Sequence, residues 1–274
     1  MKQHLIVLDL DGTLLTDEKV ISTKTEQALM AAKAEGHLVM IATGRPYRAS
    51  EPYYRQLGLD LPIVNFNGAF VHHPKDRSWK TIHEPISLPV VGDVMESIQE
   101  FNFHNIVAEV QDDVYVHQHD EKLLNIFTMG DPKVTVGDLR SYLKDNPTSL
   151  LIHPDAKDAD RIRERLGEVH AEAVDHRRWG APWHVIEIIR HGLNKAVGLS
   201  AVAGWVGVPR DRIIAFGDED NDLEMIEYAG TGVAMGNAID DLKTIADEVT
   251  GTNNEDGIAA VLEERLKLKL ASRI

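Results

Sequence analysis

The segment LIVLDLDGT, residues 5–13, joins a short apolar run to two carboxylates and a glycine. Four consecutive apolar residues are typical of a strand buried on both faces, as strands of parallel sheets are. The run cannot continue through Gly12, so Asp9 and Asp11 are expected at the carboxyl end of this strand. Ligands of open α/β sheets bind at that end, which makes both aspartates candidates for a functional site.

The same alternation of strand and helix continues to about residue 66. Thr23 and Glu26 form a capping-box pattern at the start of a helix that Gly36 ends. Two further strands are predicted at Leu38–Ala42 and Ile63–Phe66, separated by a helix at Arg48–Leu57. A βαβαβ order predicts an α/β fold with a Rossmann-like parallel sheet and helices on both faces.

The pattern changes between about residues 70 and 183. Ile106–Val110 and Val114–His117 read as a hairpin, and the segment contains more proline and histidine. After Gly192 the first pattern returns, with a helix capped by Asn194 and a buried strand at Ile213–Phe216. We therefore expect a discontinuous core domain, residues 1–83 and 185–274, interrupted by an α+β domain at 84–184.

Composition excludes several classes of protein. The 274 residues include 29 basic and 44 acidic side chains, so the net charge is 29 − 44 = −15, which disfavours nucleic acid as a partner. No apolar run approaches the roughly 20 residues of a membrane span, and the absence of cysteine suits a reducing compartment. We expect a cytoplasmic protein that binds neither nucleic acid nor membrane, and both a monomer and a homo-oligomer stay open.

Polar residues also follow the other predicted strands. Thr43-Gly44 comes after the second strand, Asn67-Gly68 after the third, and Asp218 to Asp222 after the late strand. At about 4 Å, each pair of like charges costs roughly 4 kcal/mol at an effective dielectric near 20, so clustered acids need a cation. Asp9, Asp218 and Asp222 with Mg²⁺ would make the all-oxygen site that this ion prefers.

These motifs, in this order, resemble those of the haloacid dehalogenase-like superfamily, and most of all its Cof-type phosphatases. The resemblance extends over nearly the whole chain and includes Lys195 and the segment VAMGNA at 233–238. It implies a Rossmann-like core with an inserted α/β cap domain over the active site. It also implies a Mg²⁺-dependent phosphatase that acts on small, sugar-like phosphorylated metabolites.

The resemblance further implies a role for each motif residue. Asp9 would attack phosphorus, and Asp11 would protonate the leaving oxygen and then activate water. Magnesium would be held by Asp9, the main-chain carbonyl of Asp11 and Asp218, with Asp222 close by. Phosphate would be bound by Thr43, Gly44, Lys195 and Asn221, and Asn67 would contact the substrate.

Two alternatives use the same residues. A sugar phosphomutase would return the phosphoryl group from Asp9 to the sugar, and isomerisation of a hexose 1-phosphate without release of phosphate would identify it. A non-catalytic module would carry phospho-aspartate as a signal and turn over no ester. The predicted acid at Asp11 disfavours this module, because a lasting acyl-phosphate signal gains nothing from a neighbouring general base.

Overall fold

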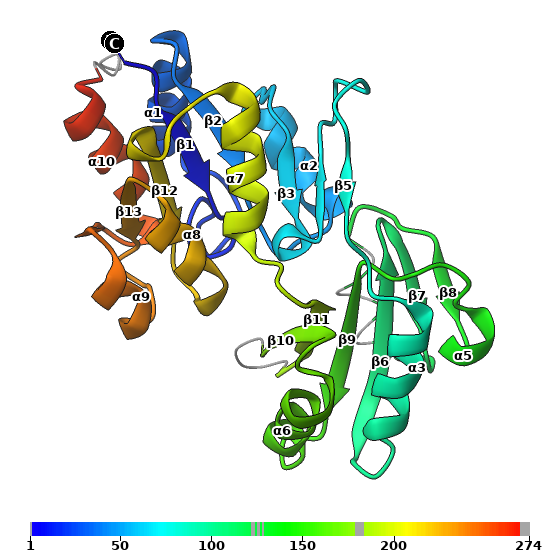
Figure 1. The fold of residues 1–274 in the computed structure, drawn as a ribbon. Helices are drawn as coiled ribbons and strands as arrows, with labels where there is room; N and C mark the ends of the chain where they lie inside the picture. Colours follow the sequence, from blue (N-terminus) through cyan, green and yellow to red (C-terminus); the bar gives the residue numbers. More distant parts are fainter. Residues whose placement is uncertain (1, 122–123, 125–126, 128, 179–183, 269–274) are drawn as a thin grey trace. The chain divides into compact units, whose positions relative to one another are not determined.

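The computed structural model describes residues 2–121, 124, 127, 129–178 and 184–268. The chain forms two compact units, drawn in Figure 1. The core unit comprises Met1–Gly44, Ser50–Thr81 and Asn194–Ile274, and the inserted unit comprises Arg45–Ala49 and Ile82–Leu193. These boundaries differ from the predicted ones, because residues 185–193 and the short segment 45–49 pack with the inserted unit.

The core unit contains a five-stranded parallel sheet in the order β14-β13-β12-β1-β2. Strand β1 lies between β12 and β2, and Leu5 pairs with both Ile213 and Leu38. All four residues of β1 are fully buried, as the apolar run predicts. The strands are β1 (Leu5–Leu8), β2 (Leu38–Ile41), β12 (Ile213–Gly217), β13 (Thr231–Ala234) and β14 (Glu248–Val249). The predicted α/β fold class is confirmed.

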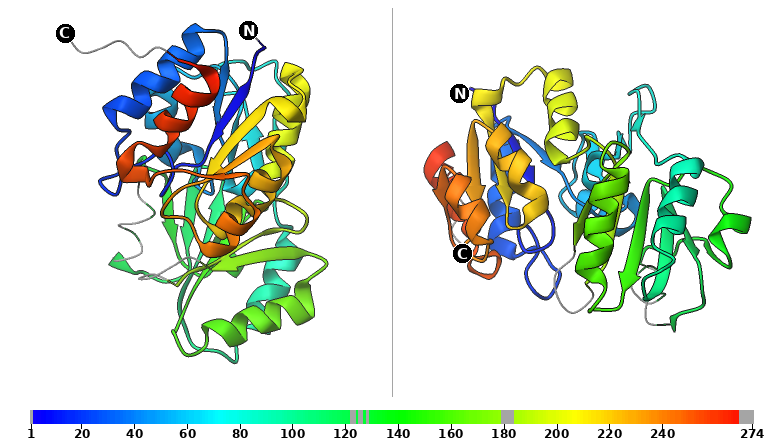
Figure 2. Two further views of the ribbon diagram at one scale, coloured as in Figure 1. Left: turned by 90° about the vertical axis from the view of Figure 1, so that its left-hand side faces the viewer. Right: turned by 60° about the horizontal axis from the view of Figure 1, so that its bottom comes forward.

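Helices cover both faces of this sheet. Figure 2 shows α1 and α10 together on one face, and α7 with α8 on the other. The helices are α1 (Thr23–Ala34), α2 (Tyr47–Gln56), α7 (Lys195–Val206), α8 (Leu223–Tyr228), α9 (Asp240–Ile245) and α10 (Gly257–Leu266). Short 3₁₀ turns occur at η1 (Phe66–Gly68), η2 (Arg210–Arg212), η3 (Asp220–Asp222) and η4 (Asn253–Glu255).

The start of α1 differs by one residue from the predicted capping box. Ser22 is the N-cap, with an extended backbone, and its Oγ accepts a hydrogen bond of 3.1 Å from the N–H of Thr25. Ser and Thr both serve as N-caps, so adjacent candidates are separated only by backbone conformation. The other predicted cap is confirmed, because Asn194 Oδ1 accepts a hydrogen bond of 3.0 Å from the N–H of Val197 in α7.

The third predicted strand does not simply extend the parallel sheet. Strand β3 (Ile63–Asn65) meets β2 only through an isolated parallel bridge between Ala42 and Val64. It then pairs antiparallel with β4 (Phe70–His72). The bridge still brings the carboxyl end of β3 beside that of β2.

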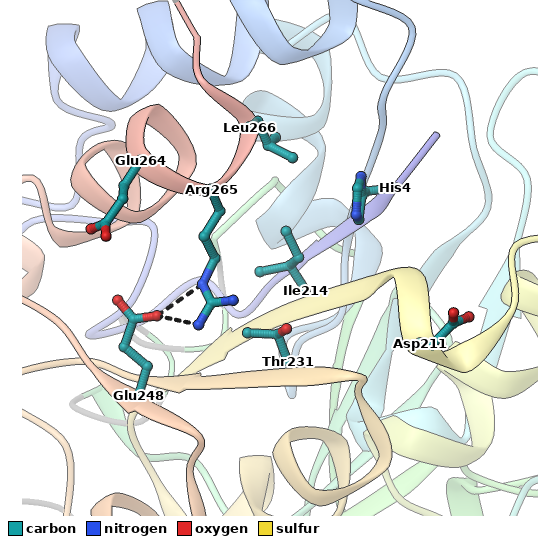
Figure 3. Close-up of a pocket in the computed structure, with 8 residues that line it drawn as sticks. All are labelled: His4, Asp211, Ile214, Thr231, Glu248, Glu264, Arg265 and Leu266. Atoms are coloured by element: carbon teal, nitrogen blue, oxygen red, sulfur yellow. Dashed lines mark hydrogen bonds and ion pairs between the residues drawn. The ribbon is translucent and has the colours of Figure 1, made fainter. Parts of the chain in front are cut away.

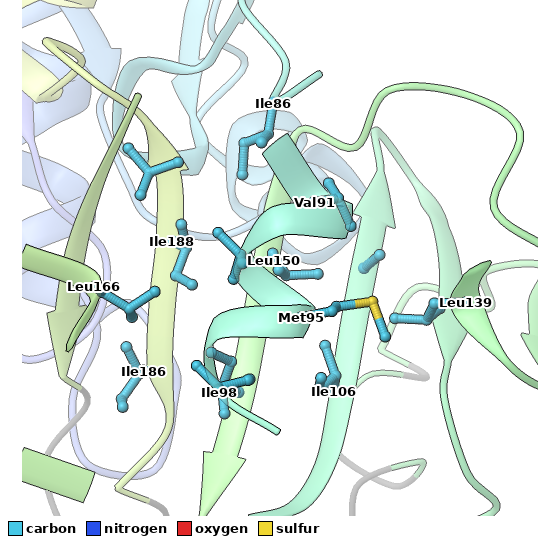
Figure 4. Close-up of a cluster of buried hydrophobic side chains, with 14 of the residues drawn as sticks. Ile86, Val91, Met95, Ile98, Ile106, Leu139, Leu150, Leu166, Ile186 and Ile188 are labelled. Carbon is cyan, nitrogen blue, oxygen red and sulfur yellow. The ribbon is translucent and has the colours of Figure 1, made fainter. Parts of the chain in front are cut away.

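The inserted unit is an α+β domain with its own core. Its sheet has the order β10-β11-β9-β6-β7-β8, and Figure 4 shows α3 packed on it, with Val91, Met95 and Ile98 facing Ile106 and Leu150. The helices are α3 (Leu88–Ser97), α5 (Leu139–Tyr142) and α6 (Ala159–His170). The strands are β5 (Ile82–His83), β6 (Phe103–Val110), β7 (Asp113–Val116), β8 (Val134–Val136), β9 (Ser149–Pro154), β10 (Val174–Arg178) and β11 (Ile186–Arg190).

A buried ion pair holds the segment 45–49 in the inserted unit. Arg48 Nη2 donates a hydrogen bond to Glu109 on β6, and the two side chains are only 6% and 5% exposed. The backbone N–H of Arg48 also donates to Asp112 Oδ1 at 2.9 Å, and Ser149 Oγ donates to the other carboxylate oxygen of Glu109 at 3.3 Å. Residues 45–49 are therefore anchored by charge as well as by packing.

None of the helices in the described ranges combines the length and the apolarity that a bilayer span requires.

Candidate active site

Three carboxylates gather at the carboxyl ends of the central strands. Asp9 follows β1 directly, and its N–H donates to the carbonyl of Phe216 on β12 at 3.2 Å. Asp218 follows β12, and Asp222 ends the turn η3. Each of the three offers an oxygen within 4.8 Å of the other two, and all three are buried. Strand order brings Asp9 and Asp218 together, because β1 and β12 are neighbours, and backbone hydrogen bonds within the loop after β12 place Asp222 beside them.

Lys195 lies between two of these carboxylates. Its Nζ donates to Asp9 Oδ1 at 2.6 Å and to Asp222 Oδ1 at 2.7 Å. The lysine and Asp222 side chains are fully buried, and Asp9 is 7% exposed. Lys195 is the first residue of α7, so the N-cap Asn194 sets where the ammonium group enters the site.

Asp222 organises the loop after β12. Its Oδ2 accepts the N–H groups of Asp218 at 3.0 Å and Glu219 at 3.2 Å, while its Oδ1 binds Lys195. Both oxygens of Asp222 therefore already have protein partners. Asp218 Oδ1 accepts a hydrogen bond of 2.6 Å from the hydroxyl of Thr13, a residue of the 5–13 segment for which the sequence alone predicts no role.

Gly12 allows the loop after β1 to approach Asp218. Its φ is +75°, and a Cβ at this position would lie 2.1 Å from Asp218 Oδ2. An L side chain would strain the backbone and overlap the carboxylate. Glycine is therefore required at position 12, because the Asp218 carboxylate occupies the space that a side chain would need.

The residues predicted to bind phosphate form a second group beside the carboxylates. The N–H of Asn67 donates to the carbonyl of Thr43 at 3.1 Å, and Asn221 Nδ2 donates to Asn67 Oδ1 at 3.1 Å. A Cβ on Gly44 would meet the Asn67 side chain at 3.1 Å. Thr43, Gly44, Asn67 and Asn221 are therefore contiguous.

The turn that carries Asn67 packs against the start of α7. Gly68 has a φ of +100°, and a Cβ there would lie 2.3 Å from the carbonyl oxygen of Asn194. Asn67 is itself left-handed, with a φ of 51°, a conformation that asparagine tolerates better than most residues. This close packing brings Asn67 and Gly68 up to the segment that holds Lys195.

Of the four aspartates predicted at the site, Asp11 is the one whose side chain is not part of the carboxylate cluster. Its side chain is 43% exposed, and its Oδ1 lies 2.8 Å from the ammonium group of Lys19. The ion pair between Lys19 and Asp11 could not be predicted from the sequence, because a single lysine eight residues from an aspartate forms no recognisable motif.

Burial is the largest cause of the pKa shifts of Asp9 and Asp218. It raises the pKa of Asp9 to about 7, although the charge of Lys195 acts in the opposite direction. It likewise raises the pKa of Asp218 to about 8, and the charges of Asp9 and Asp222 add to this effect. Burial alone would lower the pKa of Lys195, but Asp222 and Asp9 outweigh it and raise that pKa above its ordinary value.

This donor set fits a hard divalent cation. Three ionised carboxylates and one ammonium group sum to −3 + 1 = −2, and all available donors are oxygens. Mg²⁺ prefers such ligands and would balance the excess charge. Burial is the largest cause of the raised pKa values of Asp9 and Asp218, and the charges of the neighbouring carboxylates raise both pKa values further, so a bound cation would favour the ionised form of both groups.

A separate pocket lies at the other end of the core sheet, shown in Figure 3. It is lined by residues at the amino ends of the strands, including His4, Ile214 and Thr231, and the ion pair between Arg265 and Glu248 lies within it. Parallel strands place these residues away from Asp9 and Asp218, which follow the carboxyl ends. The pocket is therefore distinct from the carboxylate site.

Comparisons with known proteins agree with this geometry. The family model for haloacid dehalogenase-like hydrolases matches residues 6–262. The 5-amino-6-(5-phospho-D-ribitylamino)uracil phosphatase YitU of Bacillus subtilis is 57% identical over 97% of this chain and 99% of its own length. The pyridoxal phosphate phosphatase YbhA of Escherichia coli is 31% identical over 97% and 100%. A haloacid dehalogenase-like hydrolase from Bacteroides thetaiotaomicron superposes with a TM-score of 0.80 at 27% identity, over 96% and 99% of the two chains.

Proposed function

We propose that this chain, which belongs to the haloacid dehalogenase-like hydrolase family and is one of its phosphatases, hydrolyses phosphate monoesters in a Mg²⁺-dependent reaction through an aspartyl-phosphate on Asp9. The observation that carries the proposal is the buried arrangement of Lys195 between Asp9 and Asp222, with Asp218 beside them. The chain contains no cysteine, which favours a cytoplasmic location for the enzyme.

In the first step, an Asp9 oxygen attacks phosphorus and the bond between phosphorus and the leaving oxygen breaks. Asp11 gives its proton to that oxygen. In the second step, water attacks phosphorus, Asp11 accepts a proton from the water, and the bond to Asp9 breaks to release inorganic phosphate. A covalent carboxylate intermediate divides one difficult displacement into two easier ones. Lys195 neutralises charge beside the nucleophile throughout.

The cation would be held by Asp9, Asp218 and the main-chain carbonyl of Asp11. Asp222 is better suited to orient Lys195 and the loop after β12, because both of its oxygens already accept hydrogen bonds. When bound, Mg²⁺ screens the repulsion between the nucleophilic carboxylate and the phosphate dianion. Thr43, Gly44, Asn67 and Asn221 would then contact the phosphate or its ester.

For the substrate, we propose 5-amino-6-(5-phospho-D-ribitylamino)uracil. The support is the identity of 57% with a phosphatase named for this compound, over almost the full length of both chains. The compound carries its phosphate on a ribityl chain, which is a sugar-like alcohol and agrees with the class of ester expected from the motifs.

Release of inorganic phosphate from this compound, with and without Mg²⁺, tests the substrate proposal, and pyridoxal phosphate serves as the comparison ester. We expect the higher kcat/KM for the ribityl compound. Asp9→Asn should abolish turnover of both esters while the protein stays folded, and unchanged turnover by this variant would refute the nucleophile. Isomerisation of a hexose 1-phosphate without free phosphate would indicate the mutase instead.

A further inference from the structure

The loop after β13, residues 235–239, contains the end of the VAMGNA segment and lies beside the loop after β12. The N–H of Met235 donates to the carbonyl of Gly217 at 3.0 Å, and the N–H of Ile239 donates to the carbonyl of Asp218 at 2.9 Å. The backbone of this loop is therefore bonded to the strand end that carries Asp218. No step of the proposed reaction uses the segment.

Asn237 connects the same loop to the loop after β1. Its Nδ2 donates a hydrogen bond of 2.8 Å to the carbonyl oxygen of Gly12. Its Oδ1 accepts the N–H of Asn253, in η4, at 3.0 Å, so one donor and one acceptor of the amide are engaged and the orientation of the side chain is determined. The Gly12 carbonyl is thereby tied to a loop whose backbone is bonded to Asp218.

Gly12 is a point at which the loop after β1 needs such a contact. A glycine has more backbone freedom than any other residue and loses more of it on ordering, and Gly12 has a φ of +75°. The carbonyl of Asp11, a proposed cation ligand, belongs to the peptide bond directly before Gly12. Rotation about the backbone bonds of Gly12 would reorient that carbonyl, and a hydrogen bond on Gly12 restricts the rotation.

We propose that Asn237 is a positioning residue for the cation, and that its hold on Gly12 makes the site favour Mg²⁺ over the larger Ca²⁺. By holding the Gly12 carbonyl, it fixes the place of the Asp11 carbonyl relative to Asp218. The inference rests on the proposed function, which supplies the cation ligands. Mg²⁺ requires nearly octahedral ligands at short distances, whereas Ca²⁺ accepts a longer and more variable arrangement. A ligand that is free to move therefore costs Mg²⁺ more affinity than it costs Ca²⁺.

The size of the effect follows from the ordering of the loop before the cation binds. Without the hydrogen bond, the loop is ordered for binding in a smaller fraction of molecules, and the apparent Kd rises by the inverse of that fraction. A neutral hydrogen bond of ordinary strength corresponds to about fivefold in an equilibrium constant. Asn237→Ala should therefore raise the Kd for Mg²⁺ about fivefold and the Kd for Ca²⁺ by about twofold or less.

The test measures cation binding to the full-length chain without substrate. Magnesium chloride and calcium chloride are titrated separately into the wild type and into Asn237→Ala at pH 8, and calorimetry gives the dissociation constants. The ratio of the Ca²⁺ constant to the Mg²⁺ constant is the decisive quantity, because a general loss of stability would raise both constants by the same factor. We expect this ratio to fall by at least about twofold in Asn237→Ala.

Asn254→Ala is the matched control. Asn254 is also an exposed asparagine whose amide makes two hydrogen bonds, since its Nδ2 donates to Asp17 Oδ2 at 2.9 Å and its Oδ1 accepts the N–H of Asp17 at 3.1 Å. These bonds hold the chain beyond the site and do not involve Gly12. Both variants should therefore stay folded and lose similar amounts of thermal stability, while Asn254→Ala should keep both dissociation constants of the wild type.

Other outcomes overturn the inference in distinguishable ways. An unchanged Mg²⁺ constant in Asn237→Ala contradicts it and leaves the proposed function intact. A parallel rise of the two constants, or the same change of ratio in Asn254→Ala, shows that general loosening of the fold accounts for the effect. If the wild type binds neither cation, the carboxylate cluster is not a cation site, and the proposed Mg²⁺-dependent reaction fails together with the inference.

Discussion

At the scale of single residues, the site is governed by buried charge. Asp9, Asp218 and Asp222 are held together by strand order and by backbone hydrogen bonds, and the ammonium group of Lys195 partly offsets their charge. The residues of the cluster could be predicted from their positions after apolar strands. The separate roles of the three carboxylates could not be predicted, because they depend on Asp222 Oδ1 contacting Lys195 while Asp222 Oδ2 accepts backbone N–H groups of the loop.

The raised pKa values predict that cation binding depends on pH. At pH 6 the carboxyl groups of Asp9 and Asp218, with pKa values of about 7 and about 8 caused by burial, retain protons that a cation must displace. The apparent affinity for Mg²⁺ should therefore rise between pH 6 and pH 8. Isothermal titration calorimetry in buffers of different ionisation enthalpy measures the affinity and the protons released. Equal affinity at both pH values would contradict the prediction.

The same shifts determine how stability varies with pH. The metal-free folded protein binds protons at Asp9 and Asp218 that the unfolded chain, with ordinary carboxyl pKa values near 4, has already lost. This contribution to stability is fully present below pH 4 and is lost as pH rises through 7 to 8. Thermal melts in EDTA should show the melting temperature falling from pH 6 to pH 8, and saturating Mg²⁺ should reduce that fall.

Thr13 provides a test of the support around Asp218. Thr13→Val removes the hydroxyl that donates to Asp218 Oδ1. In the metal-free protein at pH 6, where Asp218 is protonated, this should lower the free energy of unfolding by about 1 kcal/mol, since a hydrogen bond between neutral groups contributes about 0.5–1.5 kcal/mol. Thr13→Ser keeps the hydroxyl and should recover most of the loss. Denaturant unfolding of both variants measures the difference, and a Thr13→Ser variant less stable than Thr13→Val would show that the methyl group matters instead.

At the scale of elements, the regular pattern of strands and helices was predictable and its details were not. The buried runs at Leu5 and Ile213 are strands as expected. The start of α1 was placed one residue late, because Ser22 and Thr23 are chemically equivalent caps. Strand β3 was expected to extend the sheet, but its turn at Asn67 and its pairing with β4 depend on contacts with Asn194 that a local pattern does not contain.

Two helix caps can be compared directly. Asn194→Ala and Ser22→Ala each remove an N-cap side chain and should each cost about 1 kcal/mol of stability. Of these two caps, Asn194 is the one that precedes Lys195 of the proposed active site, so Asn194→Ala should also lower kcat and Ser22→Ala should not. Denaturant melts together with steady-state assays test this, and an equal loss of kcat in Ser22→Ala would show that general stability accounts for the effect.

At the scale of the whole molecule, each unit has its own hydrophobic core and its own buried charges. Arg48→Met should destabilise the inserted unit by about 3–5 kcal/mol, because it leaves Glu109 buried without its cation. Replacing both partners, as Arg48→Met with Glu109→Leu, should recover much of the loss. Chemical denaturation followed by fluorescence measures this, and the single variant should not be more stable than the double one.

Calorimetry should assign these effects to separate units. If Mg²⁺ binds the carboxylate cluster as proposed, it binds the folded form and should raise the melting temperature of the transition that belongs to the core unit. Arg48→Met should lower the transition of the inserted unit. A shift of both transitions together, in both experiments, would mean that the two units unfold cooperatively.

The anchoring of residues 45–49 also bears on protein engineering. A chimera that exchanges only residues 82–193 with those of a relative would leave Arg48 facing a foreign partner where Glu109 and Asp112 now lie. The exchange must therefore also include residues 45–49, immediately after Gly44. A short segment that lies within the core unit in the sequence thus belongs to the inserted unit in the structure, and the order of the two domains along the chain does not show this.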